Sequence, residues 1–209
     1  MKVHDVAQGS EEWLKLRCMI PTASEFGKII TPAKGDLSSQ ATAYRHLLLA
    51  CWLKGGPVDE FLGYWMERGT EMEPEAREAY ELQTGTDVEQ VGFITRDDGM
   101  VGCSPDGLVG DPGCVEFKCP APHTHVGYLL KGTLPTQYKP QVQGQLLIAE
   151  RDWCDFMSYH PDMPPVRIRV NRDEGYIGKM KAALDKFVEQ LLEGREKLRN
   201  KGMDPRGEV

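Results

Sequence analysis

Residues that could perform metal-assisted chemistry gather between residues 102 and 120. Asp106 lies in the turn-prone sequence Ser-Pro-Asp-Gly, and Glu116 and Lys118 are two residues apart in an apolar segment. Residues two apart on a strand point to the same face of a sheet, so the carboxylate of Glu116 and the amine of Lys118 would point together. Two carboxylates and a lysine converging at one hairpin can bind a hard divalent cation beside a reacting phosphate. The segment therefore predicts the active site of a metal-dependent nuclease.

A purely structural interpretation of the same residues stays open. Pro-Asp-Gly is a common turn, and a Glu and a Lys that alternate on a strand can form a solvent-facing pair. Two details favour a functional site. The charged residues alternate with the apolar Val115, Phe117 and Cys119, and the Gly- and Pro-containing neighbourhood frees backbone carbonyls to complete a metal shell.

Length and composition indicate one soluble globular domain. The chain has 209 residues, of which 40 % are hydrophobic, and its mean hydropathy is -0.45. We expect a single domain over residues 1–209, with residues 200–209 as a frayed tail. The apolar runs are too short to span a bilayer, and the N-terminus lacks the apolar core of a signal peptide. A cytoplasmic protein with no membrane partner is expected.

The net charge of -7 argues against an exposed nucleic-acid-binding surface. The acidity is concentrated, however. Between residues 59 and 89 there are ten acidic residues and two basic ones, Arg68 and Arg77, so the rest of the chain carries about one positive charge. DNA contact is therefore possible through a local groove or channel.

The six cysteines do not suggest a metal site. None of them has Cys-x-x-Cys spacing, which is typical of structural zinc and iron–sulfur sites. We expect them to be buried free thiols. The pair His123 and His125 is too sparse to indicate a metal site by itself.

The periodicity of apolar residues predicts an α/β fold with a central mixed sheet and helices on its faces. Thr22 to Glu25 has the form of a capping box that opens a helix. Gly69 and Pro74 indicate a bend, or two consecutive helices, in the acidic region. Helices are expected at residues 10–17, 22–30, 40–54, 60–83, 122–131, 136–150 and 173–199, and strands at residues 87–95, 100–104, 108–109, 114–119, 152–159 and 166–170.

The ordered motifs resemble those of a known family. Gly102 to Leu108 followed by Glu116 to Pro120 resembles the PD-(D/E)xK nuclease signature, and in particular that of the lambda-exonuclease (YqaJ-type) viral recombinase nucleases. Further similar motifs occur in the same order, so the resemblance covers roughly residues 8–195 and implies a restriction-endonuclease-like core. These motifs are Gly9-Ser10-x-x-Trp13-x-x-x-Arg17 with Thr22-Ala23-Ser24, Arg68-Gly69-x-x-x-Glu73-x-x-Ala76-Arg77-x-x-Tyr80, and Gln141-Val142-Gln143.

The resemblance implies a set of metal ligands. Asp106 and Glu116 would bind Mg²⁺, with the carbonyl of Phe117 as a backbone ligand, and Glu73 would add a carboxylate directly or through water. Two cations about 3.5–4 Å apart can activate a nucleophile and stabilise a leaving oxygen. Mn²⁺ is expected to substitute for Mg²⁺. Without the motif, Glu73 would be typical of a solvated helix face.

The resemblance also implies roles for Lys118 and Gln141. Lys118 would orient or deprotonate the attacking water and help to neutralise the pentavalent phosphate. Gln141 would position that water or the lysine. On its own, Gln141 is typical of a surface helix residue.

A second group of residues, Arg17, Ser24 and Lys34, would hold the 5′-phosphate of a DNA end by the same resemblance. Arg offers a bidentate fork and Ser a hydroxyl donor, and both suit a phosphate monoester. Ser24 also falls in the first turn of an expected helix, where free N–H groups favour anions. The alternative is a helix-end arginine and a serine in a capping region. The loop that carries Lys34 does not match the family residue for residue.

The family resemblance implies a Mg²⁺-dependent, processive 5′→3′ exonuclease on double-stranded DNA ends. Such an enzyme releases mononucleotides and leaves a 3′ single strand for a single-strand annealing protein. Related enzymes are ring-shaped homotrimers around a central DNA channel, encoded by phages or prophages and active in the bacterial cytoplasm. Three alternatives stay open: a PD-(D/E)xK endonuclease, a carboxylate-pair hydrolase such as a glycosidase, in which Lys118 has no evident role, and a non-catalytic DNA-binding recombination scaffold.

Overall fold

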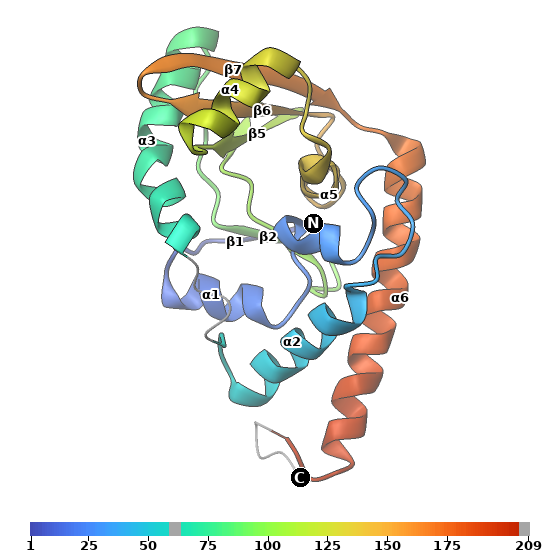
Figure 1. Ribbon diagram of the computed structural model, residues 1–209. Coiled ribbons are helices and arrows are strands. Elements are labelled where there is room, and N and C mark those ends of the chain that lie inside the picture. The colour runs from blue at the N-terminus through green and yellow to red at the C-terminus, as the bar shows by residue number, and fades with distance from the viewer. Residues whose placement is uncertain (59–63, 205–209) are drawn as a thin grey trace.

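The computed structural model describes residues 1–58 and 64–204, and Figure 1 shows how their helices and strands are arranged. The elements follow in the order β1 (Lys2–His4), α1 (Glu11–Cys18), the 3₁₀ helix η1 (Ala23–Lys28), α2 (Ala41–Lys54), α3 (Tyr64–Thr84), β2 (Phe93–Thr95), β3 (Gly102–Cys103), β4 (Gly107–Val109), β5 (Gly113–Lys118), α4 (Pro122–Lys131), the 3₁₀ helix η3 (Thr136–Tyr138), α5 (Lys139–Ile148), β6 (Trp153–His160), β7 (Met163–Asn171) and α6 (Glu174–Arg199). A mixed sheet flanked by helices confirms the predicted α/β class.

The ends of the N-terminal helices are set by local hydrogen bonds. Ser10 caps α1, since its Oγ accepts a hydrogen bond from the N–H of Trp13 at 3.2 Å. Gly55 ends α2 in the left-handed conformation, with φ of +73°. Both helices confirm their predicted positions.

The helix predicted to begin at Thr22 is wrong in type and length. The chain forms only the short η1 there, and the side chain of Thr22 makes no capping hydrogen bond. Its hydroxyl lies 3.3 Å from the hydroxyl of Ser24, and Glu25 pairs with Lys28 instead of completing a capping box. The argument that Ser24 opens an α-helix with free N–H groups is therefore not supported. The apolar side chains of this segment, Phe26, Ile29 and Ile30, are buried.

The acidic helix is one element. Helix α3 runs continuously from Tyr64 to Thr84 and includes Pro74, so of the two predicted alternatives, a bend or two consecutive helices, the second is not observed. The predicted start of this helix, at residue 60, lies outside the described residues.

Two sheets replace the single central sheet that the sequence predicted. One has three strands in the order β1-β2-β3, and the other has four in the order β4-β5-β6-β7. The strand expected at residues 87–95 is divided between them. Glu89 exchanges backbone hydrogen bonds with Leu108 of β4, whereas Phe93–Thr95 pairs with β1 and β3.

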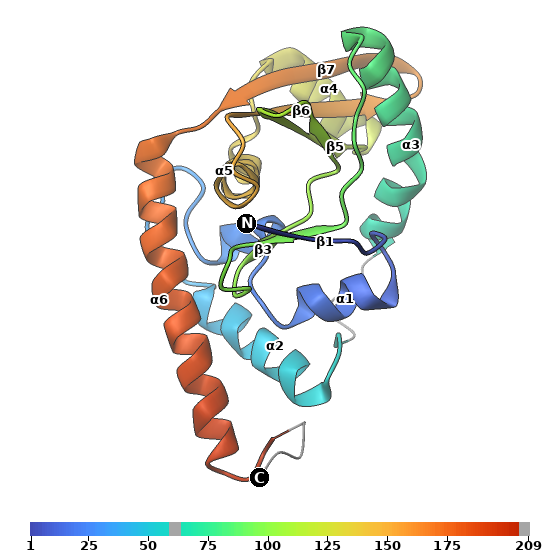
Figure 2. The same cartoon turned by 180° about the vertical axis from the view of Figure 1, so that it is seen from behind.

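The four-stranded sheet is mixed and separates two apolar cores. Strands β5 and β6 are parallel, and the other neighbours are antiparallel. Because side chains alternate along a strand, Cys114 joins the core around α5 and α6, while Val115 joins the core around α3. Figures 1 and 2 show α3 on one side of this sheet and α5 and α6 on the other. The sheet therefore offers two distinct faces on which polar groups can be placed.

The C-terminal region confirms the predicted long amphipathic helix. Asp173 caps α6 by accepting a hydrogen bond from the N–H of Tyr176 at 3.0 Å. After α6 the chain turns back, and the N–H groups of Lys201 and Met203 both donate to the carbonyl of Leu198. Of the tail predicted at 200–209, residues 205–209 lie outside the described residues.

Five of the six cysteines confirm the prediction of buried free thiols. Five are buried and Cys119 is half-buried, and none forms a disulfide within the described chain. Among the helices that the structure describes, none is both long and apolar enough to cross a membrane.

Candidate active site

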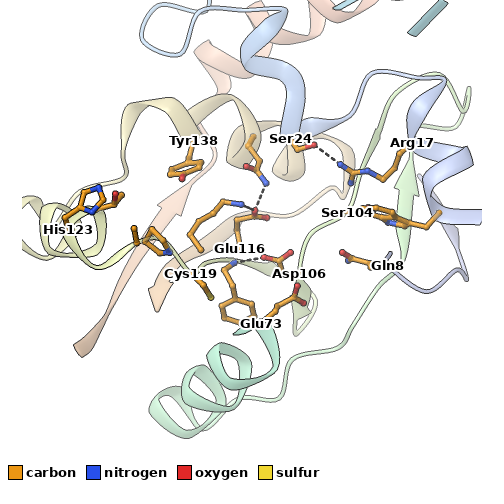
Figure 3. Close-up of a pocket in the computed structure, with 17 residues that line it drawn as sticks. Gln8, Arg17, Ser24, Glu73, Ser104, Asp106, Glu116, Cys119, His123 and Tyr138 are labelled. Carbon is orange, nitrogen blue, oxygen red and sulfur yellow. Dashed lines mark hydrogen bonds and ion pairs between the residues drawn. The ribbon is translucent and has the colours of Figure 1, made fainter. Parts of the chain in front are cut away.

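Glu116 and Lys118 share one face of β5, as the two-residue spacing predicts. Glu116 is only 2 % exposed, and its Oε1 accepts a hydrogen bond from the Nζ of Lys118. Both side chains line a cavity of about 590 Å³. Figure 3 shows Glu116 among the residues at its wall. A buried carboxylate is therefore held at the base of an open site.

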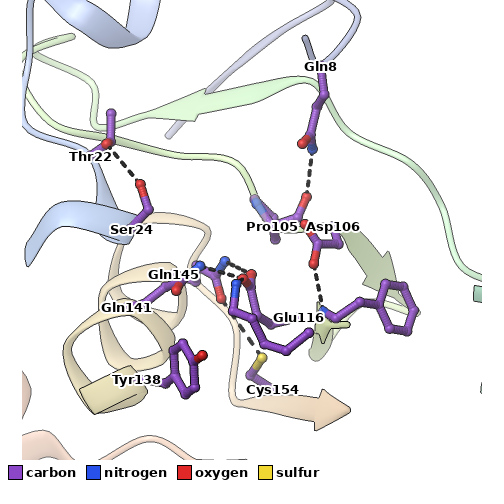
Figure 4. Close-up of polar contacts among 12 residues, drawn as sticks. Gln8, Thr22, Ser24, Pro105, Asp106, Glu116, Tyr138, Gln141, Gln145 and Cys154 are labelled. Carbon is purple, nitrogen blue, oxygen red and sulfur yellow. Dashed lines mark hydrogen bonds and ion pairs between the residues drawn. The ribbon is translucent and has the colours of Figure 1, made fainter. Parts of the chain in front are cut away.

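Helix α5 supplies two further donors to Glu116. The Nε2 of Gln141 donates to Oε1 of Glu116, and the Nε2 of Gln145, one turn later, donates to Oε2 at 2.5 Å. Residues four apart lie on the same face of a helix, so successive turns present their amides to the two oxygens of one carboxylate. Figure 4 shows this convergence. Together with Lys118, three donors fix the orientation of Glu116.

Asp106 is positioned by the turn that leads into β4. Its Oδ2 accepts a hydrogen bond from the N–H of Phe117 at 2.6 Å, so the turn is tied to the strand that carries Glu116. Gln8 also holds this turn in place by hydrogen bonds. Its Nε2 donates to the carbonyl of Pro105 at 3.0 Å and to the carbonyl of Val91 at 2.8 Å. The first residues of the chain thus support the site.

The charges at the site are unbalanced. Burial, and then the negative charge of Glu116, raises the pKa of Asp106 well above its usual range. Burial alone would lower the pKa of Lys118, but the carboxylates of Glu116 and Asp106 outweigh it and raise that pKa. Lys118 is therefore held as a cation, and the three carboxylates that line the cavity outnumber the two cations, Lys118 and Arg77, that form ion pairs with them among the described residues.

Glu73 brings a further carboxylate from α3. Its Oε1 accepts a hydrogen bond from Nη2 of Arg77 at 2.7 Å, one turn along the helix. Burial raises the pKa of Glu73, and Arg77 opposes this effect. Glu73 lines the same cavity as Asp106 and Glu116.

The cavity brings together nearly all the residues that the sequence singled out. The predicted residues that line it are Arg17, Ser24, Glu73, Asp106, Glu116, Phe117, Lys118 and Gln141. Lys34 is not among them. It is exposed on the loop after η1, where its carbonyl accepts a hydrogen bond from Lys179 on α6 at 3.0 Å. The DNA-binding role of Lys34 stays a prediction.

Arg17 and Ser24 form a pair at the cavity wall opposite Glu73 (Figure 3). The Nη2 of Arg17 donates to Oγ of Ser24 at 2.9 Å, and the guanidinium lies 4.1 Å from the ring centroid of Trp13. Among the described residues, Arg17 makes no ion pair with a carboxylate. A guanidinium with open donors facing a cavity suits an oxyanion such as phosphate.

Three contributors to the site were not assigned a role from the sequence. Gln145 holds Glu116, Tyr138 lines the cavity with its ring 5.4 Å from the Nζ of Lys118, and Gln8 supports the Asp106 turn. The four-residue spacing of Gln141 and Gln145 is the signal that could have identified the first. Neither of the others has a pattern that sequence alone would reveal.

The donor set fits a hard divalent cation. Asp106, Glu116 and Glu73 offer carboxylate oxygens, the type of ligand that Mg²⁺ and Mn²⁺ prefer. A bound cation would oppose the burial and the negative charge of Glu116 that together raise the pKa of Asp106. Within residues 1–58 and 64–204, no three His, Cys, Asp or Glu side chains are arranged closely enough to hold a metal by themselves. Backbone carbonyls, water or substrate oxygens would have to complete the shell.

Solved structures of nucleases are similar to this chain over most of its length. The alkaline exonuclease LHK-Exo from Laribacter hongkongensis is 34 % identical, with a TM-score of 0.83 over 92 % of this chain and 98 % of that one. Its complex with dAMP gives the same identity and coverage, with a TM-score of 0.82. A phage-related exonuclease from Haemophilus somnus 129PT, 20 % identical with a TM-score of 0.62 over 84 % of this chain and 96 % of that one, shares the fold.

A search of curated proteins gave no match. The sequence model of the YqaJ-like viral recombinase domain, in contrast, matches residues 12–152, which include Arg17, Ser24 and the whole Asp106–Glu116–Lys118 cluster. The family match and the similarity to LHK-Exo agree with the motifs found in the sequence. This chain belongs to the YqaJ-like viral recombinase family.

Proposed function

We propose that this chain is a metal-dependent exonuclease that degrades double-stranded DNA from its ends in the 5′→3′ direction. The observation that carries the proposal is the arrangement around Glu116. A buried carboxylate, a lysine and a glutamine meet beside Asp106 in one cavity, and Arg17 and Ser24 line the same cavity. Family membership and the 34 % identity to an alkaline exonuclease support the same conclusion.

The carboxylates of Asp106, Glu116 and Glu73, with the carbonyl of Phe117, would hold Mg²⁺ or Mn²⁺, with up to two ions in the site. A metal ion bound there lowers the pKa of a bound water and polarises the phosphoryl oxygens. The protein contributes the fixed geometry: hydrogen bonds from α5 and the Asp106 turn hold the ligands before substrate arrives.

Lys118 and Gln141 act on the reacting groups. Lys118 is held as a cation by Glu116 and Asp106, so it can stabilise the negative charge that develops on the phosphate and orient the attacking water. Gln141 lines the cavity one hydrogen bond away from the same carboxylate oxygen as Lys118, and it can position the water or the lysine.

Arg17 and Ser24 would select the DNA end. They hold no carboxylate in the structure, and together they offer a guanidinium fork and a hydroxyl to a terminal 5′-phosphate. Binding of that phosphate at a fixed distance from Glu116 would determine which phosphodiester is cut. The product would be a 5′-mononucleotide, and the relative LHK-Exo has been solved in complex with dAMP, a molecule of that kind.

The family and the net charge support a proposal for the assembly. A ring-shaped homotrimer with a basic channel would let a protein of net charge -7 act on DNA, and it would make digestion processive because an enclosed strand cannot diffuse away. The 3′ single strand would pass to an annealing protein for recombination in the cytoplasm of the bacterial host of a phage. A stable monomer in sedimentation would contradict the ring.

The proposal is tested with linear duplexes that carry either a 5′-phosphate or a 5′-hydroxyl, in Mg²⁺ or in EDTA. We expect rapid digestion of the 5′-phosphorylated duplex in Mg²⁺, release of mononucleotides, and no digestion in EDTA. Indifference to the 5′ group would contradict the role of Arg17 and Ser24. Cleavage of closed circular plasmid would favour an endonuclease, and absence of any cleavage would favour a DNA-binding scaffold.

A further inference from the structure

Of the donors to Glu116 that the described residues provide, Gln145 is the one that does not line the cavity. Gln145 is 1 % exposed, and its Nε2 donates a hydrogen bond to Oε2 of Glu116 at 2.5 Å. Lys118 and Gln141 both donate to the other oxygen, Oε1, and both line the cavity. Oε1 of Glu116 therefore accepts hydrogen bonds from two residues that line the cavity, and Oε2 accepts one from a residue that does not.

The amide of Gln145 is itself held in one orientation. Its Oε1 accepts a weak hydrogen bond from the Sγ of Cys154, at 3.9 Å, and Cys154 lies on β6 beside β5. Because the thiol donates to the oxygen end, the nitrogen end of the amide faces Glu116 (Figure 4). A thiol on one strand thus orients the amide that holds a carboxylate on the next.

In the proposed reaction, the three donors do not all keep their hydrogen bonds to Glu116. Lys118 and Gln141 must turn toward water and phosphate, which weakens their hold on Oε1 of Glu116. Gln145 has no access to the cavity and no other acceptor among the described side chains. Its hydrogen bond is the one that can persist throughout the reaction.

We propose that Gln145 is a positioning residue for the metal: its buried amide anchors one oxygen of Glu116 so that the other stays directed into the cavity. This inference rests on the proposed metal-dependent function and adds a residue that touches neither metal nor substrate. Hydrogen-bond partners of metal ligands typically contribute about 10- to 100-fold to metal affinity or activity.

Helix α5 also supplies a matched control. Gln143 is 1 % exposed, like Gln145, and lies two residues earlier. Its side chain serves only the backbone: Nε2 donates to the carbonyl of Asn171 and Oε1 accepts from the N–H of Asp173, both at 2.9 Å. Replacing either glutamine with leucine removes a buried amide, but only one replacement affects Glu116.

The test measures Mn²⁺ binding by calorimetry to the full-length wild type, Gln145→Leu, Gln145→Met and Gln143→Leu, and the Mn²⁺ dependence of DNA digestion by each. Two Gln145 variants are used because they place different strain on the core. We expect both to weaken Mn²⁺ binding about 10- to 100-fold and to raise the half-saturating Mn²⁺ concentration by the same factor. Their rate at saturating Mn²⁺ should change less than the affinity. Gln143→Leu should lower thermal stability and leave Mn²⁺ affinity near wild type.

The outcomes separate the two proposals. Wild-type Mn²⁺ affinity in a folded Gln145 variant, or equal weakening in Gln143→Leu, would overturn the positioning role and leave the nuclease intact. Mn²⁺ binding that depends on Gln145 in a protein that digests no DNA would overturn the proposed function and retain the inference. A wild type that binds no Mn²⁺ would overturn both.

Discussion

Two buried carboxylates lie on neighbouring strands of one sheet, and they face opposite sides. Glu116 on β5 points toward α5 and an open cavity, whereas Asp155 on β6 points toward α3. Asp155 is fully buried, and Tyr80 and two arginines donate to it: its Oδ1 accepts from Nε of Arg169 at 2.8 Å, and its Oδ2 accepts from the Tyr80 hydroxyl at 2.8 Å and from Arg167 at 3.1 Å. Both carboxylates have several donors, yet their electrostatic balance differs.

The difference lies in the ratio of acids to bases. At Asp155 one carboxylate meets two guanidinium groups. Burial would raise the pKa of Asp155, but the hydrogen bonds from Arg169 and Tyr80 outweigh it and lower that pKa. At the cavity, the ion pairs that the described residues make with the three carboxylates come from Lys118 and Arg77, and burial, followed by the charge of Glu116, raises the pKa of Asp106 instead. A buried acid with sufficient cations stabilises the fold, and a cluster of acids with too few prepares a site for an external cation.

Substitution of Lys118 should have the largest effect. Lys118→Ala removes a preorganised positive charge from the reacting phosphate, and we expect DNA digestion to slow by about 10²–10³-fold, or about 2.7–4 kcal/mol of the barrier. The measurement is the rate of mononucleotide release at saturating Mg²⁺.

Lys139 is the matched control for Lys118. It too pairs with a carboxylate, Asp173 at 2.9 Å, and lies over an aromatic ring, that of Tyr176, at 4.4 Å. It does not line the cavity, so Lys139→Ala should keep its activity. Full activity of Lys118→Ala, in protein free of contaminating nuclease, would contradict the catalytic role of Lys118 and the contrast between the cavity and the Asp155 cluster.

At Asp155 we expect a loss of stability with little change in activity, the opposite of the effect at Lys118. Asp155→Ala leaves two guanidinium groups and the Tyr80 hydroxyl without their acceptor, and loss of one partner of a buried pair costs about 3–5 kcal/mol. We expect about 3 kcal/mol, the lower end, because both arginines are partly exposed and can be rehydrated. Urea unfolding measures the loss. Activity of the folded fraction should stay within about twofold of wild type; a tenfold change would correspond to about 1.4 kcal/mol of barrier. A larger loss of activity would mean that the two faces of the sheet are coupled.

The sequence predicted which residues meet at the cavity better than it predicted the framework. Glu116 and Lys118 share a face because strand periodicity is local, and the alternation of Cys114 and Val115 between two cores follows from the same rule. The motif order brought in Glu73, which no local pattern would have marked. These predictions depend on short spacings or on the resemblance.

What the sequence missed depends on contacts between distant segments. The strand expected at residues 87–95 is divided because Glu89 pairs with Leu108, and Thr22 bonds to Ser24 instead of capping a helix. Asp155 was not singled out, since its two arginines meet it only when β6 and β7 pair. Long-range pairing decides these features, and composition carries little information about it.

Arg17 extends the comparison to cations. Arg17 and Arg169 each lie over a tryptophan ring, at 4.1 and 3.5 Å. Within residues 1–58 and 64–204, Arg169 pairs with a carboxylate and Arg17 does not. Arg17→Ala should reduce the preference for a 5′-phosphate over a 5′-hydroxyl by about tenfold, or about 1.4 kcal/mol. The ratio of digestion rates on the two duplexes measures this loss.

The control for Arg17 is Lys15→Ala on the same helix. Lys15 pairs with Glu11 at 2.7 Å and does not line the cavity, so its removal should leave the phosphate preference unchanged. An unchanged preference in Arg17→Ala would mean that Arg17 packs on Trp13 without reading the DNA end.

The smallest expected effect is the pH dependence of stability that Asp155 contributes. Its pKa in the folded protein lies below the value of about 3.9 in an unfolded chain. The carboxylate therefore stabilises the fold fully above that unfolded value, and the contribution is lost as pH falls through the folded pKa. The difference in unfolding free energy between wild type and Asp155→Asn should be constant from about pH 7 to pH 5 and shrink below about pH 4. Urea titrations at each pH measure it. A difference that grows on acidification would mean that Asp155 is destabilised as an anion, like Asp106, and the contrast between the two faces of the sheet would disappear.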